Sequence, residues 1–407
     1  MNYEIFTQSV RGFSHIKKDI PREDSGIKLN EDEIKVFAVA DGHGDPRCCR
    51  AHIGSDLICK IAATEMKEFA LTIQKEDWTD KLFDSREFLK LIRTLVTSII
   101  GKWGNAVNDE FEHNPLTNEE LSATSGLGID SSSSLGIEKI YGTTLIAGLI
   151  TDRYLLLIQQ GDGRCDVFDA QGVVSQPIPW DERCVGTGTT SVCDNDAIQS
   201  TRYHIIDITK TPVIACIAGT DGVEDSFPMS MERVHAYFRD LIAYCCTEGT
   251  EGLELYLERE LSELSKNGST DDITVSGIID VDRCKPFLQN FKDENELVNI
   301  SEDIKAIDMR ISSIVDGGKY THFKKIRDDA VAKYEQAYIS ADMNMKIKLY
   351  DLEKEKVRAE SDFAPLREKY DDLLQLKKEK EDKLKSITEE IKQRSLLHSC
   401  MKNPAER

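Results

Sequence analysis

The sequence predicts an α+β fold in which two antiparallel β-sheets stack as a central β-sandwich flanked by helices, followed by an α-helical or coiled-coil C-terminal extension. Strand-like apolar runs recur between Tyr141 and Asp280, and turn signals such as Gly-Asp-Gly separate them. A few helical segments interrupt these runs, which favours stacked sheets covered by helices. After about residue 286 the composition shifts to Lys, Glu, Leu and Ile, which indicates the extension.

The N-terminal part is predicted to hold strands and then two helices. Residues 3–40 are predicted as strand, turn, strand, and residues 48–75 and 84–112 as helices. The second helix is indicated by apolar residues at helical spacing, namely Phe88, Leu91, Ile92, Leu95, Ile99 and Trp103. Residues 113–138, with the low-complexity run Asp130–Ser134, are predicted as a loop.

The middle of the chain is predicted to be mostly strands. The runs are TTLIAGLI, RYLLLIQQ, CDVFDA, TRYHIIDI, TPVIACIAGT and DITVSGIID. Helical segments are expected at Ser230–Cys246 and Glu251–Leu264. We therefore expect a first domain over residues 1–285 and a helical extension over residues 286–407.

Two patterns define the extension. Isoleucines at a three-four spacing predict an amphipathic helix that ends at Gly317-Gly318, and they are Ile304, Ile307, Ile311 and Ile314. A heptad seam, interrupted by Lys377 and Lys380, predicts a coiled coil or helical hairpin within residues 320–395. The seam comprises Leu366, Tyr370, Leu373, Leu384, Ile387 and Ile391. A solvated single helix, or a helix folded back on the body, is the alternative.

Composition excludes several classes of protein. The 407 residues carry a formal net charge of −21, which disfavours non-specific binding to nucleic acid or to an anionic membrane. The 11 cysteines are scattered without a C-x-x-C spacing, which fits reduced thiols better than a disulfide framework or a zinc site. The N-terminal stretch has no apolar signal core and no run reaches membrane-spanning length, so a cytoplasmic location is expected.

The stretch VFAVADGHGD joins a buried strand to an abrupt polar turn. Val36, Phe37 and Val39 favour the strand, and the two glycines that follow favour a sharp turn or a close approach of the backbone. Asp41 and His43 are then held at a strand end, where rigid backbone can position them for chemistry. An ordinary Asp-Gly turn with a solvated histidine is the alternative interpretation.

Other acidic residues occupy the same setting. Asp162 and Asp221 each follow an apolar strand, Asp271-Asp272 open one, and Glu23-Asp24 precede a polar turn. If these carboxylates met, they would repel one another unless a cation neutralised them. Clusters of oxygen ligands suit Mg²⁺ or Mn²⁺ rather than zinc. Two such ions can share a carboxylate, and Gly42 would let a backbone carbonyl join them as a ligand.

These segments resemble the metal-dependent protein serine/threonine phosphatases of type 2C, the PPM family. The matching segments are PREDSG, FAVADGHGD, YGTTL, IQQGDGRCDVF, GTDGVEDSF and GSTDDITV. They occur in the order and spacing of the family over roughly residues 5–282, with a resemblance to bacterial members. The resemblance implies the type 2C phosphatase fold for residues 1–285.

The resemblance also implies roles for individual residues. Two Mn²⁺ or Mg²⁺ ions would be bridged by Asp41, with a looser third ion at Asp162. The full set of implied metal ligands is Glu23, Asp24, Asp41, Gly42, Asp162, Asp221 and Asp271. A metal-bridging hydroxide would attack the phosphorus, and His43 would protonate the leaving serine or threonine oxygen.

Three positions depart from the family pattern. Many members carry an arginine four residues before the acid matched by Glu23, and here Asp19 stands there. Lys18 or Arg22 are the candidates to bind the substrate phosphate instead, with Lys17 and the less favoured His15 as alternatives. Asp272 stands where the family often has asparagine, and Asp45 where a glycine is usual. These changes bear on phosphate affinity and peptide preference more than on metal binding.

The sequence thus predicts a protein serine/threonine phosphatase that acts on phosphoprotein substrates. The alternative is a weak or inactive pseudo-phosphatase that acts as a scaffold through its helical tail. Retention of an acidic residue at every metal motif argues against a dead site. A two-metal hydrolase for nucleic acid is disfavoured by the net charge. The C-terminal helices are expected to mediate homodimerisation, to bind a partner protein or to pack on the first domain.

Overall fold

The computed structural model describes residues 2–31, 33–124, 136–186, 188–227, 230–316, 318–339 and 346–402. The chain divides into two compact units, Met1–Phe291 and Lys292–Arg407. The boundary that the sequence predicts at residue 285 stays a prediction, and Asp130–Ser134 lies outside the described residues.

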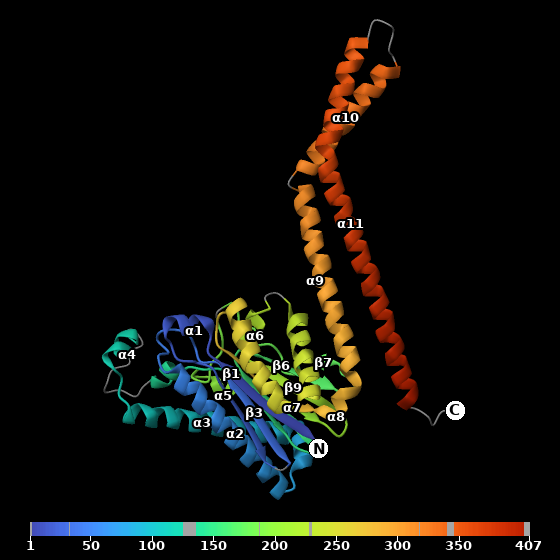
Figure 1. Ribbon diagram of the computed structural model, residues 1–407. Helices are drawn as coiled ribbons and strands as arrows, with labels where there is room; N and C mark the ends of the chain where they lie inside the picture. Colours follow the sequence, from blue (N-terminus) through green and yellow to red (C-terminus); the bar gives the residue numbers. More distant parts are fainter. Residues whose placement is uncertain are drawn as a thin grey trace. The chain divides into compact units, whose positions relative to one another are not determined.

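Two five-stranded antiparallel sheets form the centre of the first unit (Figure 1). Their strand orders are β1-β10-β9-β6-β7 and β2-β3-β4-β5-β8. The strands are β1 Tyr3–Val10, β2 Ser25–Glu31, β3 Ile34–Ala40, β4 Leu145–Ile150, β5 Tyr154–Gln160, β6 Arg164–Asp169, β7 Val174–Ser175, β8 Arg202–Asp207, β9 Val213–Gly219 and β10 Ile273–Asp280. This arrangement confirms the predicted α+β sandwich.

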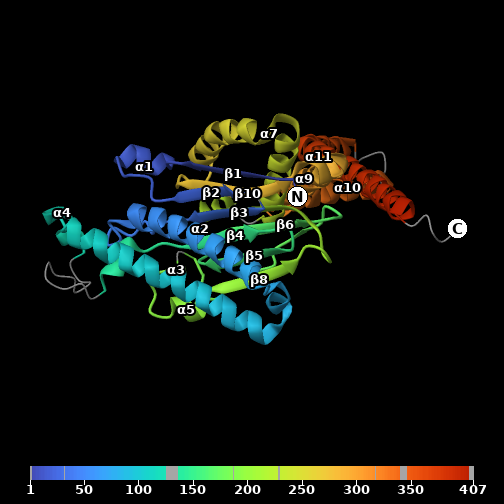
Figure 2. The same ribbon diagram turned by 90° about the horizontal axis from the view of Figure 1, so that it is seen from below.

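Helices cover both outer faces of the sandwich (Figure 2). Helices α2 and α3 pack on the sheet that contains β3, and α7 packs on the sheet that contains β10. The helices of this unit are α1 Phe13–Lys18, α2 Ala51–Lys75, α3 Ser85–His113, α4 Asn118–Ala123, α5 Ala197–Ser200, α6 Asp221–Asp225, α7 Met231–Asn267 and α8 Val281–Cys284. Short 3₁₀ turns lie at η1 Thr79–Phe83, η2 Ile137–Tyr141 and η3 Lys285–Phe287.

Three layers of apolar side chains explain why the central strands are continuous apolar runs. One layer lies between α2, α3 and their sheet, one between α7 and the other sheet, and one between the two sheets. Strand β5 is buried along its whole length because it faces helices on one side and the opposite sheet on the other. Strand β8 lies at the edge of its sheet and is only half-buried, which accounts for its mixed composition.

Two local predictions are corrected by the structure. Residues 3–40 form three strands and the short helix α1, rather than strand, turn, strand. Strand β2 lies at the edge of its sheet and is partly exposed, so its apolar pattern is weak. Residues 113–138 are not all loop, since a capping box at Thr117 begins α4.

The two helices expected at Ser230–Cys246 and Glu251–Leu264 are confirmed. They are the two parts of α7, which non-helical backbone at Gly249 separates.

Strand register brings the acidic segments to one edge of the sandwich. Ala40 pairs with Ser25 in one sheet, and Gly219 pairs with both Arg164 and Val275 in the other. The acidic residues predicted from the sequence lie within four residues of these paired positions along the chain. Because the strands are antiparallel, the ends of some and the beginnings of others meet at this edge.

The second unit is built from long helices. Helix α9 Leu288–Asp316 begins in the first unit and continues into the second, followed by α10 Lys319–Ile339 and α11 Lys346–Lys402. Within the second unit α11 runs back along α9 (Figure 1). The helical C-terminal extension is therefore confirmed.

The heptad seam of α11 faces inward within this helical unit. Leu373 and Ile387 are buried there. The two lysines that interrupt the seam pair with α9, because Lys377 Nζ lies 2.6 Å from Asp308 Oδ1 and Lys380 Nζ lies 2.7 Å from Asp303 Oδ2. The helical hairpin is thus held by apolar contacts and by cross-helix ion pairs. The predicted coiled coil between chains stays a prediction.

No helix within the described ranges is long and apolar enough to cross a membrane.

Candidate metal and active site

Three of the predicted acidic residues converge at the edge of the sandwich. One carboxylate oxygen from each of Asp41, Asp162 and Asp221 lies within 4.8 Å of the others. Asp41 follows β3, Asp162 lies in the turn between β5 and β6, and Asp221 opens α6. Residues 180 positions apart in the chain thus offer an oxygen-only group of ligands of the kind that hard divalent cations prefer.

Asp41 is fixed through its own backbone. Its N–H donates to Thr144 Oγ1 at 2.9 Å, and its carbonyl accepts from Thr144 N at 2.8 Å and from the Thr143 hydroxyl at 2.9 Å. These bonds continue the antiparallel β3–β4 pairing beyond the last residue of β3 and before the first residue of β4. They hold the carboxylate in place without occupying either of its oxygens.

Gly42 is required by packing. A Cβ atom at this position would lie 2.6 Å from the carbonyl oxygen of Glu23 and 3.0 Å from Ala51. The tight contact is therefore with the chain itself, and the approach of a metal to the Gly42 backbone stays a prediction. The contact also brings the Glu23 segment against the Asp41 segment. His43 follows, and its N–H donates to Gly142 O at 3.0 Å.

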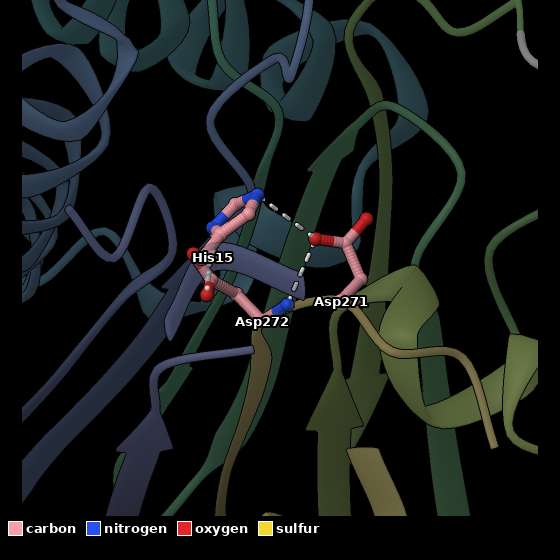
Figure 3. A group of neighbouring side chains, drawn as sticks. All are labelled: His15, Asp271 and Asp272. Atoms are coloured by element: carbon pink, nitrogen blue, oxygen red, sulfur yellow. Dashed lines mark hydrogen bonds and ion pairs between the residues drawn. The ribbon is translucent and has the colours of Figure 1, made fainter. Parts of the chain in front are cut away.

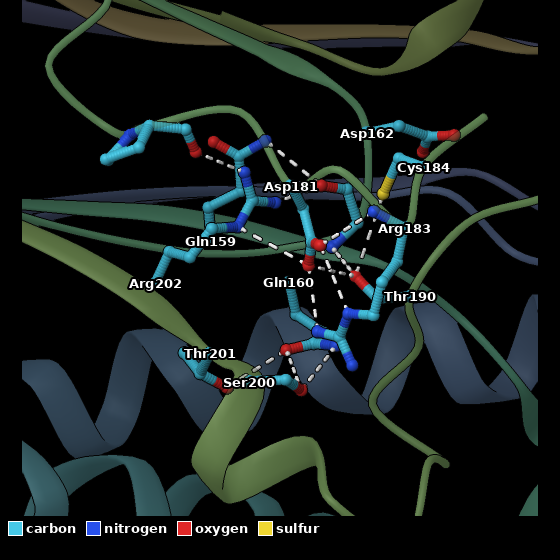
Figure 4. Close-up of polar contacts among 12 residues, drawn as sticks. Gln159, Gln160, Asp162, Asp181, Arg183, Cys184, Thr190, Ser200, Thr201 and Arg202 are labelled. Carbon is cyan, nitrogen blue, oxygen red and sulfur yellow. Dashed lines mark hydrogen bonds and ion pairs between the residues drawn. The ribbon is translucent and has the colours of Figure 1, made fainter.

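The turn that carries Asp162 is held by a polar network (Figure 4). Gly161 has a φ of 104°, which favours glycine, and its N–H donates to Thr190 Oγ1 at 3.1 Å. The Arg202 guanidinium donates to the Gly161 carbonyl. The Thr189 hydroxyl donates to Asp162 Oδ1 at 2.8 Å and so orients the carboxylate. The sequence does not reveal this network, because its members come from a loop without a motif.

Asp24 and Asp221 are joined through Thr220. The hydroxyl of Thr220 donates to Asp24 Oδ2 at 2.7 Å, and Asp24 is buried. Thr220 directly precedes Asp221, so this bond ties the Glu23–Asp24 loop to the first turn of α6. The acidic pair and the acidic triad therefore belong to one site.

Asp272 organises the loop that carries Glu23 and Asp24. Its buried carboxylate accepts from the backbone N–H groups of Gly12, Glu23 and Asp24. Burial by itself would raise the pKa of Asp272, but contact with His15 and the backbone hydrogen bonds lower it below its usual value. Both oxygens are engaged by the backbone, which makes Asp272 a positioning residue rather than a metal ligand.

A second acidic group surrounds His15 (Figure 3). The Nδ1 atom of His15 lies 3.0 Å from Asp272 Oδ1. Its Nε2 atom lies 3.6 Å from Asp271 Oδ1 and 3.8 Å from Glu23 Oε2. The pKa of the buried His15 is raised, chiefly by its contact with Asp272. The sequence favoured Lys18 and Arg22 over this histidine, since nothing in the pattern shows that α1 turns His15 inward.

Lys18 and Arg22 differ in their surroundings. Lys18 is exposed at the end of α1, and the backbone of Asp19 ends that helix at a φ of 57°. Arg22 donates through Nε to the Asp24 carbonyl at 3.0 Å and through a terminal nitrogen to the Ser9 carbonyl at 3.2 Å. Its guanidinium thus braces the loop. Phosphate binding by Lys18 or Arg22 stays a prediction.

Mutual repulsion and burial shift the pKa values of the site. Burial is the main cause for Asp41, and the charges of Asp221, Asp24 and others add to it, so the pKa of Asp41 is raised well above its usual value. Burial and the Asp162 charge raise the pKa of Asp221 to about 7. Burial also raises the pKa of Glu23 to about 7. Such a cluster is costly to ionise without a neutralising cation.

Divalent cations fit the donor set on these grounds. The ligand atoms are oxygens, and three carboxylates converge. The raised pKa values of Asp41 and Asp221 show that the protein does not compensate their negative charges. Asp271 is more exposed than the others, and its charge raises the pKa values of Asp41 and Asp221.

The comparisons with known proteins agree with this chemistry. The family model described as protein phosphatase 2C matches residues 11–263. The chain therefore belongs to the protein phosphatase 2C family. Its class of enzyme is protein serine/threonine phosphatase.

Solved structures of this class resemble the chain at low identity. The catalytic domain of serine threonine protein phosphatase PstP in complex with two manganese ions is 16% identical, covers 68% of this chain and 97% of its own, and has a TM-score of 0.39. Phosphatase Stp1 from Staphylococcus aureus is 15% identical (69% and 94%, TM-score 0.40). PppA from Pseudomonas aeruginosa is 14% identical (69% and 98%, TM-score 0.41). No curated protein matches the chain.

Proposed function

We propose that this protein hydrolyses phosphoserine and phosphothreonine monoesters in proteins, with two divalent cations at the edge of the sandwich. The observation that carries the proposal is the convergence of Asp41, Asp162 and Asp221. Asp41 would be the shared ligand, because it is buried among the other acids. Burial and the charges of these acids together raise the pKa of its carboxyl group. When bound, Mn²⁺ or Mg²⁺ would supply an activated water and neutralise charge on the phosphoryl group.

The remaining ligands are assigned by position. Asp221, Asp271 and the Gly42 carbonyl would complete the shells of the two cations, with Glu23 and Asp24 reaching one of them directly or through water. Thr220 and Asp272 support this assignment, since they fix the Glu23–Asp24 loop beside α6. Asp162 would hold a third, looser cation, oriented by Thr189.

His43 would protonate the leaving serine or threonine oxygen. It is only two residues from Asp41 and its backbone is tied to Gly142. Burial lowers the pKa of His43, although the charge of Asp162 opposes this effect. A lowered pKa makes the protonated form a stronger acid, which suits transfer of a proton to an alkoxide.

The test is a phosphatase assay on the full chain with p-nitrophenyl phosphate and with a phosphothreonine peptide, in Mn²⁺, in Mg²⁺ and in EDTA. We expect cation-dependent turnover that falls more than about a hundredfold in Asp41→Asn, because a ligand shared by two cations is lost. Asp282→Asn is the matched control, since Asp282 is an exposed carboxylate in α8. Equal turnover in EDTA and in Mn²⁺ would contradict the proposal.

A further inference from the structure

A cavity of about 400 Å³ opens near His43, the proposed proton donor. Its lining includes Asp45, Arg47, Cys48, Lys139, Cys193 and Asp194. These residues come from the segment after Asp-Gly-His-Gly, from η2, and from the loop before α5. None of them belongs to the proposed set of metal ligands.

Gly142 lies between His43 and a residue that lines this cavity. A Cβ atom on Gly142 would lie 2.6 Å from His43 Cδ2 and 3.3 Å from Cys193 Sγ, and Cys193 lines the cavity. The cavity is therefore close to the imidazole. If His43 protonates the leaving oxygen, the serine or threonine residue that carries this oxygen lies near the cavity as well.

The charged side chains that line the cavity differ in whether they have a hydrogen-bond or ion-pair partner. The Arg47 guanidinium pairs with the Asp45 carboxylate, with Nε 2.9 Å from Oδ1. Asp194 Oδ2 accepts from the backbone N–H of Ser191 at 2.8 Å. Among the residues that the structure describes, no carboxylate lies within 4.0 Å of Lys139 Nζ.

Lys139 is well placed to act as the free cation of the cavity. This residue is exposed, and it lines the cavity together with Cys193. The backbone of Lys139 is fixed in η2, where its carbonyl accepts from Gly142 N at 3.3 Å. In a chain with a net charge of −21, a fixed cation next to the active site favours an anionic group of a ligand.

We propose that this cavity is a subsite for the peptide segment that flanks the phosphorylated serine or threonine, and that Lys139 selects an acidic side chain in that segment. The inference rests on the proposed phosphatase function. It names the substrate class more narrowly, as phosphoproteins with aspartate or glutamate near the modified residue. Lys139 then determines specificity without taking part in the chemical step.

The test uses the full chain with Mn²⁺ and phosphothreonine peptides that differ only in their flanking residues, which are glutamate, glutamine or lysine. We expect kcat/KM to be about fivefold higher for the glutamate peptide than for the lysine peptide. In Lys139→Glu this preference should reverse. Lys75→Glu is the matched control, because Lys75 is an exposed lysine at the far end of α2 and should keep the wild-type preference.

Two outcomes would overturn the inference: no preference in the wild-type chain, or the same preference in Lys139→Glu as in the wild type. Turnover of p-nitrophenyl phosphate by the wild type reports the proposed function without any peptide. If that turnover is absent, fluorescence anisotropy of the same labelled peptides decides the question. Tighter binding of the glutamate peptide that reverses in Lys139→Glu supports the subsite, and binding independent of residue 139 overturns it.

Discussion

The buried carboxylate of Asp272 accepts a hydrogen bond from the backbone N–H of Glu23, although the two residues are 249 positions apart in the chain. This contact fixes the loop that carries two of the proposed ligands before any cation binds. Asp272 thus prepares the site by binding the backbone of this loop rather than the carboxylates of Glu23 and Asp24.

The first prediction concerns Asp272→Asn. An asparagine presents an amide N–H₂ in place of one acceptor, so at least one buried backbone donor loses its partner. We expect a loss of unfolding free energy of about 1–3 kcal/mol, together with weaker Mn²⁺ binding. Urea unfolding and calorimetric titration with Mn²⁺ measure the two effects. Unchanged stability would show that the loop does not depend on this carboxylate.

The second prediction concerns His43 as the proton donor. His43→Gln should lower kcat on a phosphothreonine peptide by about 10²–10⁴-fold, because an alkoxide is a poor leaving group without a proton. On p-nitrophenyl phosphate the loss should be below about tenfold, since p-nitrophenolate leaves readily. His113→Gln, at an exposed histidine near the end of α3, is the control. Equal losses on both substrates would remove the proton-donor role.

The third prediction is a pH dependence of the cation-free protein. Folding raises the pKa values of Glu23 and Asp221 to about 7 from ordinary values near 4, so the folded state holds these protons more tightly than the unfolded state. The stability that this provides is fully present below about pH 4 and is lost as the pH rises through about 7.

The melting temperature in EDTA should therefore fall by several degrees between about pH 5.5 and about pH 8. Because cations neutralise the ionised carboxylates, the increase in melting temperature caused by Mn²⁺ should be larger at the higher pH. Asp271→Asn removes a charge that raises the pKa values of both Glu23 and Asp221, so it should reduce the fall in EDTA. A melting temperature in EDTA that rises over this interval would contradict the electrostatic account.

The fourth prediction concerns the helical hairpin. Leu373 is buried within the second unit, and its neighbour Leu374 is 42% exposed on the same helix. Leu373→Ala should cost about 2 kcal/mol of unfolding free energy, whereas Leu374→Ala should change it by less than about 0.5 kcal/mol. Urea unfolding followed by helical circular dichroism compares the two variants. Equal effects would show that the seam of α11 is not packed inside the chain.

The sequence predicted the fold where periodicity is strong. The apolar runs of β4, β5, β9 and β10 are buried on both faces, so each is visible as a strand in the sequence. Helix α1 was missed because it is short, and strand β2 because it lies partly exposed, where hydrophobic patterning is weak. The heptad pattern indicated the C-terminal hairpin, but it could not show that α9 supplies the acidic partners of Lys377 and Lys380.

The site was only partly predictable for a related reason. Strand-end acids can be read from local motifs, and the convergence of Asp41, Asp162 and Asp221 follows from strand register. The roles of Asp272 and His15 depend on contacts between segments far apart in the chain, which no local motif records. Gly42 was expected to admit a metal, and its contact with the Glu23 carbonyl is visible only in three dimensions.

The central claim, that this acidic edge holds divalent cations bridged by Asp41, is tested most directly by anomalous diffraction from crystals of the full chain grown with Mn²⁺. The account predicts two strong manganese peaks that share the Asp41 carboxylate as a ligand. It also predicts the loss of at least one of these peaks in Asp41→Asn. Well-ordered crystals with no manganese peak among Asp41, Asp162 and Asp221 would contradict it.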